Sequence, residues 1–575
     1  MLVFIGMMLV IIAQLANLQL FSDEYKIMAD DQGKFRKVIY PDRGLVFDRN
    51  KKPILQNAII YDLMITPNKI KGIDTALLCK ILQIDSTQFM KKLVEVIIRN
   101  GRARPSVFEA MLTDDKMAML NESMYRFVPG FYLQERSIRK FPYNAAANIL
   151  GYTAEVDSNF LKKHKEEGYM PGDYAGMTGL ERSYEKVLMG QRGIEFWKRD
   201  NKNRLTEKLE GGKFDTLPIA GQNLYSSIDI ELQQLGEKLM QNKLGSLVAI
   251  VPLHEGVITT DFSVTCHGAF YGCGSGRPMR CLDYGTFNLR NAITVSDNTY
   301  FATVMQRVIN NPLYPSVDSS LTVWNKYMYA FGLGHKLGVD IPAEKAGFIP
   351  TPKYYDKAYG KGRWNYCSFR SVSIGQGEVD NTPLQVANEM AYIANKGWYI
   401  IPHVIDSIAG GDQFGLLDKF KIKHQAIDIA DSIYEAVHDG MQGVVERGTG
   451  AGAKVKDVVI CGKTGTVENY YRGVKQPNHS FFAAFAPRIN PKIAIMCVVE
   501  NSGRFGGTYA APIVSFMIEK YLKDSITDKA RLARIETLSN QNLMPPRIYS
   551  ELRRIDSLDH IGDSAYLLQK GYIKI

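Results

Sequence analysis

The chain has 575 residues, of which 45% are hydrophobic, a length typical of about three or four domains with well-packed cores. Its net charge of +10 is spread along the chain and forms no basic stripe, which argues against a nucleic-acid partner but is compatible with an anionic membrane surface or an acidic polymer. The seven cysteines are odd in number and irregularly spaced, so they do not form a disulfide framework.

Residues 1–21 form an apolar run that only Gln14, Asn17 and Gln19 interrupt. A helix of this length spans a bilayer, and no small-residue cleavage site precedes the polar Ser22. The run is therefore predicted to be a retained transmembrane anchor, with a buried globular helix as the alternative. No Lys or Arg precedes it, so the positive-inside rule does not predict the orientation of this helix in the membrane. We expect a single-pass protein of the cytoplasmic (inner) membrane whose bulk lies in the periplasm.

Short strands and helices alternate after the anchor. The predicted elements are a strand–turn–strand unit, an extended run and a helical region, at residues 38–50, 59–65 and about 70–100. The helical region has an apolar stripe made of Leu77, Leu78, Ile81 and Leu82. Short strands and turns follow, and together these elements indicate an α+β domain over 22–221.

The pattern changes near residue 222. Asp229 is predicted to cap a helix whose apolar face contains Leu232, Leu235 and Leu239, and a second amphipathic helix covers about 429–444. Strands are predicted at 224–228, 246–251, 458–460, 480–485 and 493–499. These elements indicate an antiparallel sheet flanked by helices over 222–525. The polar, basic remainder, 526–575, is predicted to be a loosely ordered tail.

A Lys463-Thr464-Gly465 motif, followed by Thr466, comes after the apolar run 458–460, from which Cys461 and Gly462 separate it. A cation and a hydroxyl side by side can bind a carboxylate, and glycine lets a peptide backbone lie along a strand edge. The tripeptide by itself is weak evidence, because an ordinary β-turn could have the same sequence.

A second motif, Ser296-Asp297-Asn298, lies between two helical patterns. In a turn between helices, the Ser296 hydroxyl could pass protons and the Asn298 amide could hold a substrate carbonyl. A plain helix N-cap is the alternative. The order of the two motifs along the chain favours a functional pair.

With these motifs the chain resembles the class B penicillin-binding proteins, and among them the elongation-type transpeptidases. Three further stretches carry the resemblance: Arg43–Asn50, Gly176–Glu181 with Tyr184 and Glu185, and Ser373–Gly377 through Thr382–Gln385. The similarity runs in family order from residue 1 to about 520. It implies a pedestal or dimerisation domain followed by a transpeptidase domain, and D,D-transpeptidation through an acyl-serine.

The resemblance also implies a role for each motif residue. Ser296 and Asn298 would relay protons and orient substrate, and Lys463 with Thr464 would hold the substrate carboxylate or tune the proton network. Gly465 would leave room on the strand edge, and the Thr466 N–H would be an oxyanion donor. The implied partners are peptidoglycan stem peptides, a membrane glycan polymerase of the elongation machinery, and β-lactams if a nucleophile exists. No cofactor or metal is implied.

One part of the family pattern is missing. The family places a Ser-x-x-Lys nucleophile after its first strand pair, but here the strand ending near Val251 is followed at once by Leu253–Thr259, which resembles a segment beyond the central helix. The second strand and the central helix are missing with it. The two Ser-x-x-Lys matches, beginning at Ser137 and Ser183, lie upstream of the predicted transpeptidase domain.

Two interpretations of this gap remain open. The domain could be incomplete, so that this copy is inactive or a non-catalytic scaffold or activator of the elongation machinery. Alternatively, the recorded sequence could be a damaged version of an active enzyme, which we favour, because a natural pseudoenzyme would be expected to keep its core and lose only reactive side chains.

The cysteines give weaker signals. Cys79, Cys367, Cys461 and Cys497 are predicted to pack as small hydrophobic residues. Cys266, His267, Cys273 and Cys281 gather in a predicted Gly-rich loop, with Asp261 and Asp283 nearby. Their spacing is not that of a structural zinc site, so free thiols or a single disulfide are favoured over metal binding, which stays open.

Overall fold

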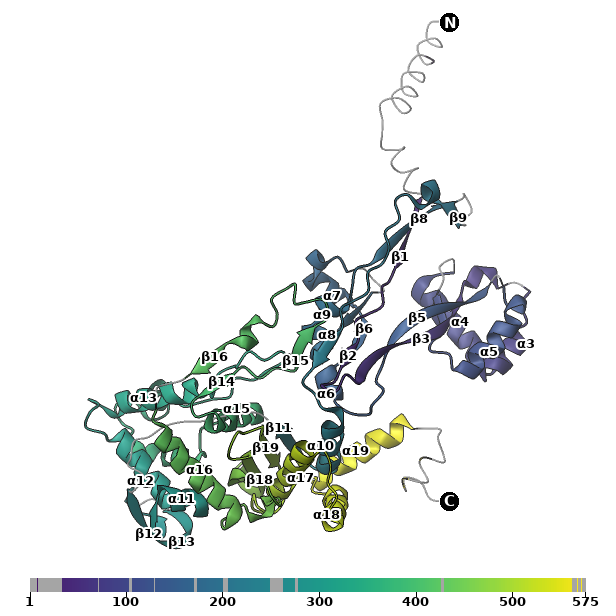
Figure 1. Ribbon diagram of the computed structural model, residues 1–575. Coiled ribbons are helices and arrows are strands. Elements are labelled where there is room, and N and C mark those ends of the chain that lie inside the picture. Colours follow the sequence, from purple (N-terminus) through teal and green to yellow (C-terminus); the bar gives the residue numbers. More distant parts are fainter. Residues whose placement is uncertain are drawn as a thin grey trace. The chain divides into compact units, whose positions relative to one another are not determined.

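The computed structural model describes residues 34–70, 72–102, 106–128, 130–169, 173–199, 205–248, 262–274, 278–425 and 429–560, with the single residues 8, 566 and 570. The chain divides into two compact units, 1–226 with 406–411, and 227–405 with 412–575 (Figure 1). Apart from Met8, the predicted anchor at 1–21 lies outside the described residues. Among the residues described, we find no helix with the length and apolar character that crossing a membrane requires.

The first unit is built around a six-stranded sheet. Its strands follow the order β15-β10-β2-β3-β4, with β5 paired to β3. Their bounds are β2 Val46–Phe47, β3 Pro53–Ile65, β4 Ser106–Glu109, β5 Phe131–Lys140, β10 Leu224–Ser226 and β15 Ile405–Ile408. The long antiparallel pair β3–β5 runs in register from Gln56 opposite Lys140 to Ile65 opposite Phe131.

Three helices bury their apolar faces against the end of β3. They are α3 (Thr75–Leu82), α4 (Ser86–Asn100) and α5 (Asp114–Ser123). The predicted stripe on α3 is confirmed, since Leu78, Ile81 and Leu82 are buried in one cluster with Leu63 and Ile65 of β3. Asp74 and Asp85 cap α3 and α4 by accepting backbone N–H bonds, which explains why these helices begin where they do.

The other elements of the first unit are short. Strands β1 (Lys34–Ile39), β8 (Gly193–Arg199) and β9 (Leu205–Lys208) form a three-stranded sheet, and β6 (Thr153–Glu155) pairs with β7 (Tyr174–Gly176). The helices are α6 (Ala147–Leu150), α7 (Ser158–Lys163), α8 (Gly179–Ser183) and α9 (Glu185–Leu188).

A buried ion network joins two of the stretches that carry the family resemblance. The Arg43 guanidinium lies 2.5 Å from carboxylate oxygens of both Glu181 and Glu185. Arg139 of β5 lies 2.5 Å from the other oxygen of Glu181, whose side chain is fully buried. Because a buried carboxylate is stable only when charges and donors surround it, this network fixes the turn before β2 against α8 and α9.

The second unit contains the predicted antiparallel sheet. Its described strands are β11 (Gly245–Val248), β17 (Cys461–Tyr471), β18 (Val474–Ala486) and β19 (Ile493–Val499), in the order β11-β19-β18-β17. Strand β19 is buried almost without alternation, which requires cover on both faces of the sheet. The helices that contact these strands are α10 (Ile230–Met240), α15 (Pro383–Ala394), α16 (Asp431–Glu446) and α17 (Ala510–Lys523). Asp229 caps α10 as predicted.

The proposed gap in the family pattern falls outside the described residues, because these stop at Val248 and resume at Phe262. The chain resumes with β12 (Ser263–Phe270) and β13 (Met279–Asn288), which form a separate antiparallel hairpin. The Gly-rich loop predicted around Cys266 and Cys281 is therefore wrong, because pairing between the two segments makes them strands. Four helices and two short strands complete this part: α11 (Leu289–Val295), α12 (Asn298–Ile309), α13 (Val317–Ala330), α14 (Pro352–Tyr359), β14 (Trp398–Ile400) and β16 (Lys423–Gln425).

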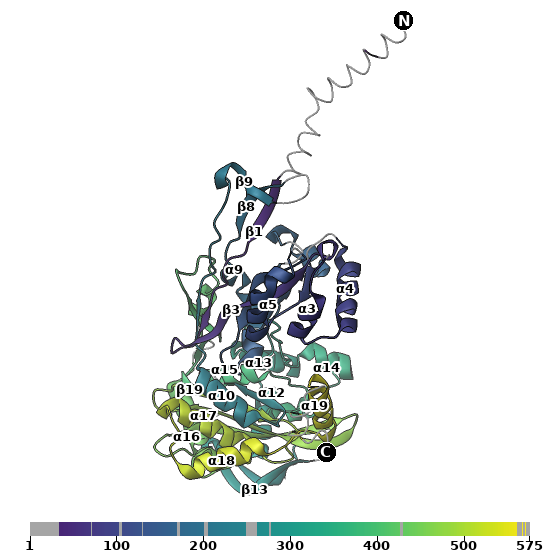
Figure 2. The same ribbon diagram turned by 90° about the vertical axis from the view of Figure 1, so that its right-hand side faces the viewer.

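The C-terminal region is more ordered than predicted. Residues Lys529–Asn540 form helix α18, which packs on α10 beside α17 (Figure 2). Ile535 and Leu538 are buried in the main core, and the Lys243 ammonium donates to the carbonyls of Leu538 and Gln541 at the end of α18. The loosely ordered tail is therefore wrong for this stretch, because a narrow apolar face and one buried cation suffice to dock a polar helix. Helix α19 (Pro546–Asp559) follows and has no buried residue.

Candidate functional site

The Ser296-Asp297-Asn298 motif forms the predicted turn between two helices. Ser296 ends α11 in a left-handed conformation, with φ 62°, which is uncommon for a residue other than glycine. The Asp297 carboxylate accepts the Tyr300 N–H at 2.6 Å and so caps α12. Asn298 begins α12, and its side-chain amide donates to the Arg280 carbonyl at 2.8 Å. The N-cap alternative thus applies to Asp297, whereas the Ser296 hydroxyl contacts Lys463.

Lys463, Thr464 and Gly465 lie within β17 and not in a β-turn. β17 is the outermost strand of the sheet that the described residues form, so one of its sides can accept another strand. Gly465 is opposite Phe481 of β18, and a Cβ at Gly465 would lie 3.1 Å from that ring. The buried Thr464 hydroxyl is hydrogen-bonded to Thr449 at 2.5 Å.

The fold brings these two motifs into contact. The Lys463 ammonium donates to the Ser296 hydroxyl at 2.6 Å, across 167 residues of sequence, and to the Thr464 carbonyl at 2.8 Å. A hydroxyl and a partly buried cation are thereby held side by side next to the edge of β17. Such a pair can bind an anionic group and can exchange a proton between its two members.

Burial changes the acidity of this pair. Removal of its ammonium group from water lowers the pKa of Lys463 to about 8. Lys463 is thus mainly charged at neutral pH, but it loses its proton more easily than a lysine on the surface. This property suits both a carboxylate anchor and a member of a proton relay.

Two residues at this site escaped sequence analysis. The side-chain amide of Gln376 donates to the Thr466 carbonyl at 3.2 Å, and Thr449 contacts Thr464 as described above. Gln376 lies in a stretch whose sequence signals only the family resemblance, and Thr449 lies in a Gly-Thr-Gly run that fits many loops. No local pattern assigns chemistry to either residue, because both act through partners about 15 to 90 residues away.

Neither Ser-x-x-Lys match joins the site residues. Ser137 and Lys140 lie on β5 at an odd spacing, so their side chains leave the strand on opposite faces. Ser183 ends α8 and Lys186 lies in α9. All four residues belong to the first unit, whereas Ser296 and Lys463 belong to the second.

A cysteine cluster lies next to the second motif. Sulfur atoms of Cys266 and Cys281 and a carboxylate oxygen of Asp297 all lie within 4.8 Å of one another. The Thr299 hydroxyl lies 3.2 Å from the Cys266 sulfur and 2.8 Å from the Cys281 sulfur. These three groups are of metal-ligating types but fall one short of the tetrahedral set of a structural zinc site. His267 is not a member of this group.

The other cysteines differ in part from expectation. Cys461 and Cys497 are fully buried, as predicted for small apolar residues. Cys367 was wrongly placed with them, because it forms a disulfide with Cys273, 94 residues away. Sequence spacing cannot reveal a pairing of this kind, which depends on two distant loops meeting. Cys273 is thereby excluded as a metal ligand.

Two family models match the chain. The penicillin-binding protein dimerisation domain matches residues 38–226, and the penicillin-binding protein transpeptidase domain matches residues 246–519. Among curated proteins, the peptidoglycan D,D-transpeptidase MrdA of Acinetobacter baumannii is 26% identical, over 88% of this chain and 84% of the relative. The protein of the same name from Escherichia coli K12 is 25% identical, over 90% of this chain and 92% of the relative.

Solved structures share the fold. PBP2 in the complex of PBP2 and MreC from Helicobacter pylori matches with a TM-score of 0.67 and 21% identity, covering 85% of this chain and 99% of that chain. Pseudomonas aeruginosa PBP2 matches with a TM-score of 0.58 and 22% identity, over 86% of this chain and 98% of that chain. The two domain models in order, the relatives of nearly equal extent and this fold agree: the chain belongs to the class B penicillin-binding proteins, of the elongation type.

Proposed function

We propose that the second unit binds the carboxylate end of a peptidoglycan stem peptide at the edge of β17. The contact between Lys463 and Ser296, 2.6 Å long, is the observation that supports this most strongly. It places a cation and a hydroxyl where an extended peptide could add to the outermost strand of the sheet. The protein would act in cell-wall elongation, anchored in the cytoplasmic membrane by residues 1–21, with both units in the periplasm.

Each motif residue has a defined task in this proposal. Lys463 and Thr464 bind the carboxylate, Gly465 lets the peptide lie close to the strand, and Asn298 holds a peptide carbonyl. The N–H of Thr466 points to the same side of β17 as its carbonyl, because both groups of one residue leave an antiparallel strand together. That side is the one on which Gln376 lies, so Thr466 could donate to a peptide oxygen there.

We further propose that this chain binds stem peptides without forming the acyl-enzyme of its family. Acyl transfer to serine needs a hydroxyl that a neighbouring base deprotonates and that oxyanion donors face. The family supplies this hydroxyl from a Ser-x-x-Lys segment, and neither match to that pattern in the sequence is in the same unit as Lys463. β-Lactams would then bind reversibly at most.

A scaffold or activator is the second candidate. The dimerisation model matches residues 38–226, which make up most of the first unit, and this match does not involve the nucleophile segment. Related structures have been solved as a complex with MreC and as part of a peptidoglycan synthase complex. By this proposal the first unit engages a membrane glycan polymerase or another member of the elongation machinery.

Sequencing of the codons for Ile250 to Leu253 tests whether the gap in the family pattern is genuine. If an inserted Ser-x-x-Lys segment is found there, the proposal of a non-catalytic chain is wrong and the protein has the nucleophile of its family.

Peptide binding should depend on pH through Lys463. A peptide ending in D-Ala-D-Ala should bind the full chain with constant affinity up to about pH 8 and about ten-fold more weakly for each further pH unit, because only the protonated amine attracts the carboxylate. Titration calorimetry between pH 6 and 10 measures this. The same peptide with a C-terminal amide should bind at least about ten-fold more weakly at pH 7.

Lys463→Arg is the matched variant, because a guanidinium stays charged over this whole range. Its affinity, even if lower, should not change between pH 7 and 10. Equal binding of the carboxylate and amide peptides, or the same pH profile in Lys463→Arg, would show that Lys463 is not the anchor.

A further inference from the structure

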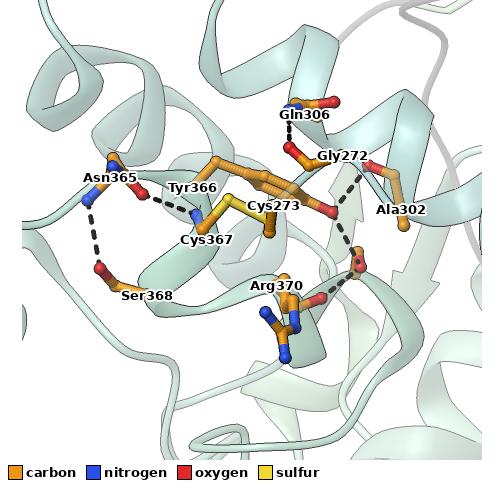
Figure 3. The surroundings of a disulfide bond; sticks show 10 residues. Gly272, Cys273, Ala302, Gln306, Asn365, Tyr366, Cys367, Ser368 and Arg370 are labelled. Carbon is orange, nitrogen blue, oxygen red and sulfur yellow. Dashed lines mark hydrogen bonds between the residues drawn. A yellow bond between two sulfur atoms is a disulfide. The ribbon is translucent and has the colours of Figure 1, made fainter. Parts of the chain in front are cut away.

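A disulfide connects two loops of the second unit. Cys273 follows β12, and Cys367 lies in the short 3-10 helix Tyr366–Ser368; their Cα atoms are 5.6 Å apart (Figure 3). Both partners lie next to a cluster of buried aromatic side chains that includes Phe270, Tyr366 and Phe369. The bond therefore fixes the segment that begins at Tyr366 to the hairpin formed by β12 and β13.

This segment is also tied to the helix that follows the second motif. The Tyr366 hydroxyl donates to the Ala302 carbonyl of α12 at 2.7 Å (Figure 3). It also lies 3.5 Å from the Ser373 hydroxyl. The Ser373 hydroxyl in turn donates to the Arg370 carbonyl. Residues Arg370–Ile374 form a second 3-10 helix, so the chain from 366 to 374 is held at its start by a covalent bond and along its length by hydrogen bonds.

Gln376 comes directly after this segment and reaches the peptide-binding edge. It lies between Gly375 and Gly377, whose φ angles of 71° and 82° favour glycine. Its backbone N–H donates to the Ser371 carbonyl at 3.1 Å, and its side-chain amide donates to the Thr466 carbonyl at 3.2 Å. The tight turn thus aims the amide at β17, at the residue after the Lys463-Thr464-Gly465 motif.

We propose that Gln376 is a positioning residue for the edge of β17, and that the Cys273–Cys367 disulfide holds it in place. On the outer edge of β17, the Thr464 carbonyl accepts a hydrogen bond from the Lys463 ammonium, and the Thr466 carbonyl accepts one from the Gln376 amide. The second of these bonds fixes the peptide plane beyond Thr466, next to the N–H that would face a bound peptide. This inference rests on the proposed peptide site, but it concerns how well ordered the edge strand β17 is before any peptide binds.

The proposal makes the order of the site dependent on oxidation. Formation of the bond removes two electrons and two protons from the thiols of Cys273 and Cys367, and an external disulfide that accepts them leaves as two thiols. Disulfides of this kind persist in oxidising compartments such as the periplasm, which agrees with the predicted location of the unit. In a reducing medium the segment from Tyr366 to Gln376 would lose its covalent tie.

Hydrogen exchange on the full chain in detergent tests the proposal without any ligand. Peptide fragments covering 463–470 should exchange about three- to ten-fold faster in dithiothreitol than in oxidised protein, since one hydrogen bond that orders the edge is weakened. Gln376→Ala and the double variant Cys273→Ser/Cys367→Ser should show the same increase without reductant. Gln376→Glu keeps the size of the side chain but donates nothing at neutral pH, so it should behave like Gln376→Ala.

Two control variants isolate the effect. Gln233→Ala removes a side-chain amide of α10 that donates to Glu237, and Cys79→Ser removes an unpaired cysteine of the first unit; neither should alter exchange at 463–470. Normal exchange there in Gln376→Glu, or a reductant effect confined to 270–274 and 366–374, would overturn the proposal. Because no peptide is added, failure of this test is distinct from failure of the proposed peptide binding, which the calorimetric titration measures separately.

Discussion

A fluorescent penicillin should leave the full chain without a covalent label after an incubation that labels an intact class B penicillin-binding protein to completion. Acylation requires a nucleophilic hydroxyl with a base, and loss of the nucleophile in a serine enzyme lowers the rate roughly a million-fold. The sequence has no Ser-x-x-Lys in the second unit, so a label should be missing even at long incubation times. Gel fluorescence and the intact mass of the protein measure it.

The result that would contradict this prediction is specific. Ser296 accepts a hydrogen bond from Lys463, so this pair is the one serine–lysine contact that the described residues place at the site. Saturable labelling that survives denaturation, and that disappears in Ser296→Ala, would show that Ser296 is itself the nucleophile of this chain. Labelling that persists in Ser296→Ala would mean that a serine elsewhere reacts.

Replacement of Glu181 by alanine should destabilise the first unit by about 3–5 kcal/mol, the effect typical of breaking a buried ion pair. The Glu181 carboxylate is fully buried and lies 2.5 Å from both Arg43 and Arg139. Its removal takes the paired carboxylate away from the buried Arg139 and leaves Arg43 with Glu185. Urea unfolding, followed by hydrogen exchange of fragments from 130–188, measures the loss.

Glu207→Ala is the matched control. Glu207 pairs with Lys198 at 2.7 Å in the same unit, but both side chains are largely exposed. An exposed pair contributes less than about 1 kcal/mol, so unfolding should hardly change. Equal effects of the two substitutions would show that the network around Glu181 is not a stabilising centre of the unit.

The local predictions that succeeded depend on short-range physics. The stripe of α3 and the cap at Asp229 follow from helical spacing and from a side chain that accepts nearby N–H groups, and the structure has both. The turn around Ser296 was predictable for the same reason, since helical patterns flank it on both sides.

Predictions failed where a distant partner decides the outcome. Helix α18 has a polar sequence, yet it docks because Lys243, almost 300 residues earlier, binds its last carbonyls. The local sequence predicts that Cys367 packs as a small hydrophobic residue, but it forms a disulfide with Cys273, 94 residues away. Spacing within a segment carries no information about such contacts.

The sequence by itself determined the family, the order of the two domains and the two motifs at Ser296 and Lys463, because these depend on residue types at fixed local spacings. The tertiary structure alone decided that Lys463 contacts Ser296, that burial lowers the pKa of Lys463 to about 8, and that Gln376 reaches Thr466. These properties arise from distances between segments and from exclusion of water. Both are set by how the helices and the sheet pack together and not by any single stretch of chain.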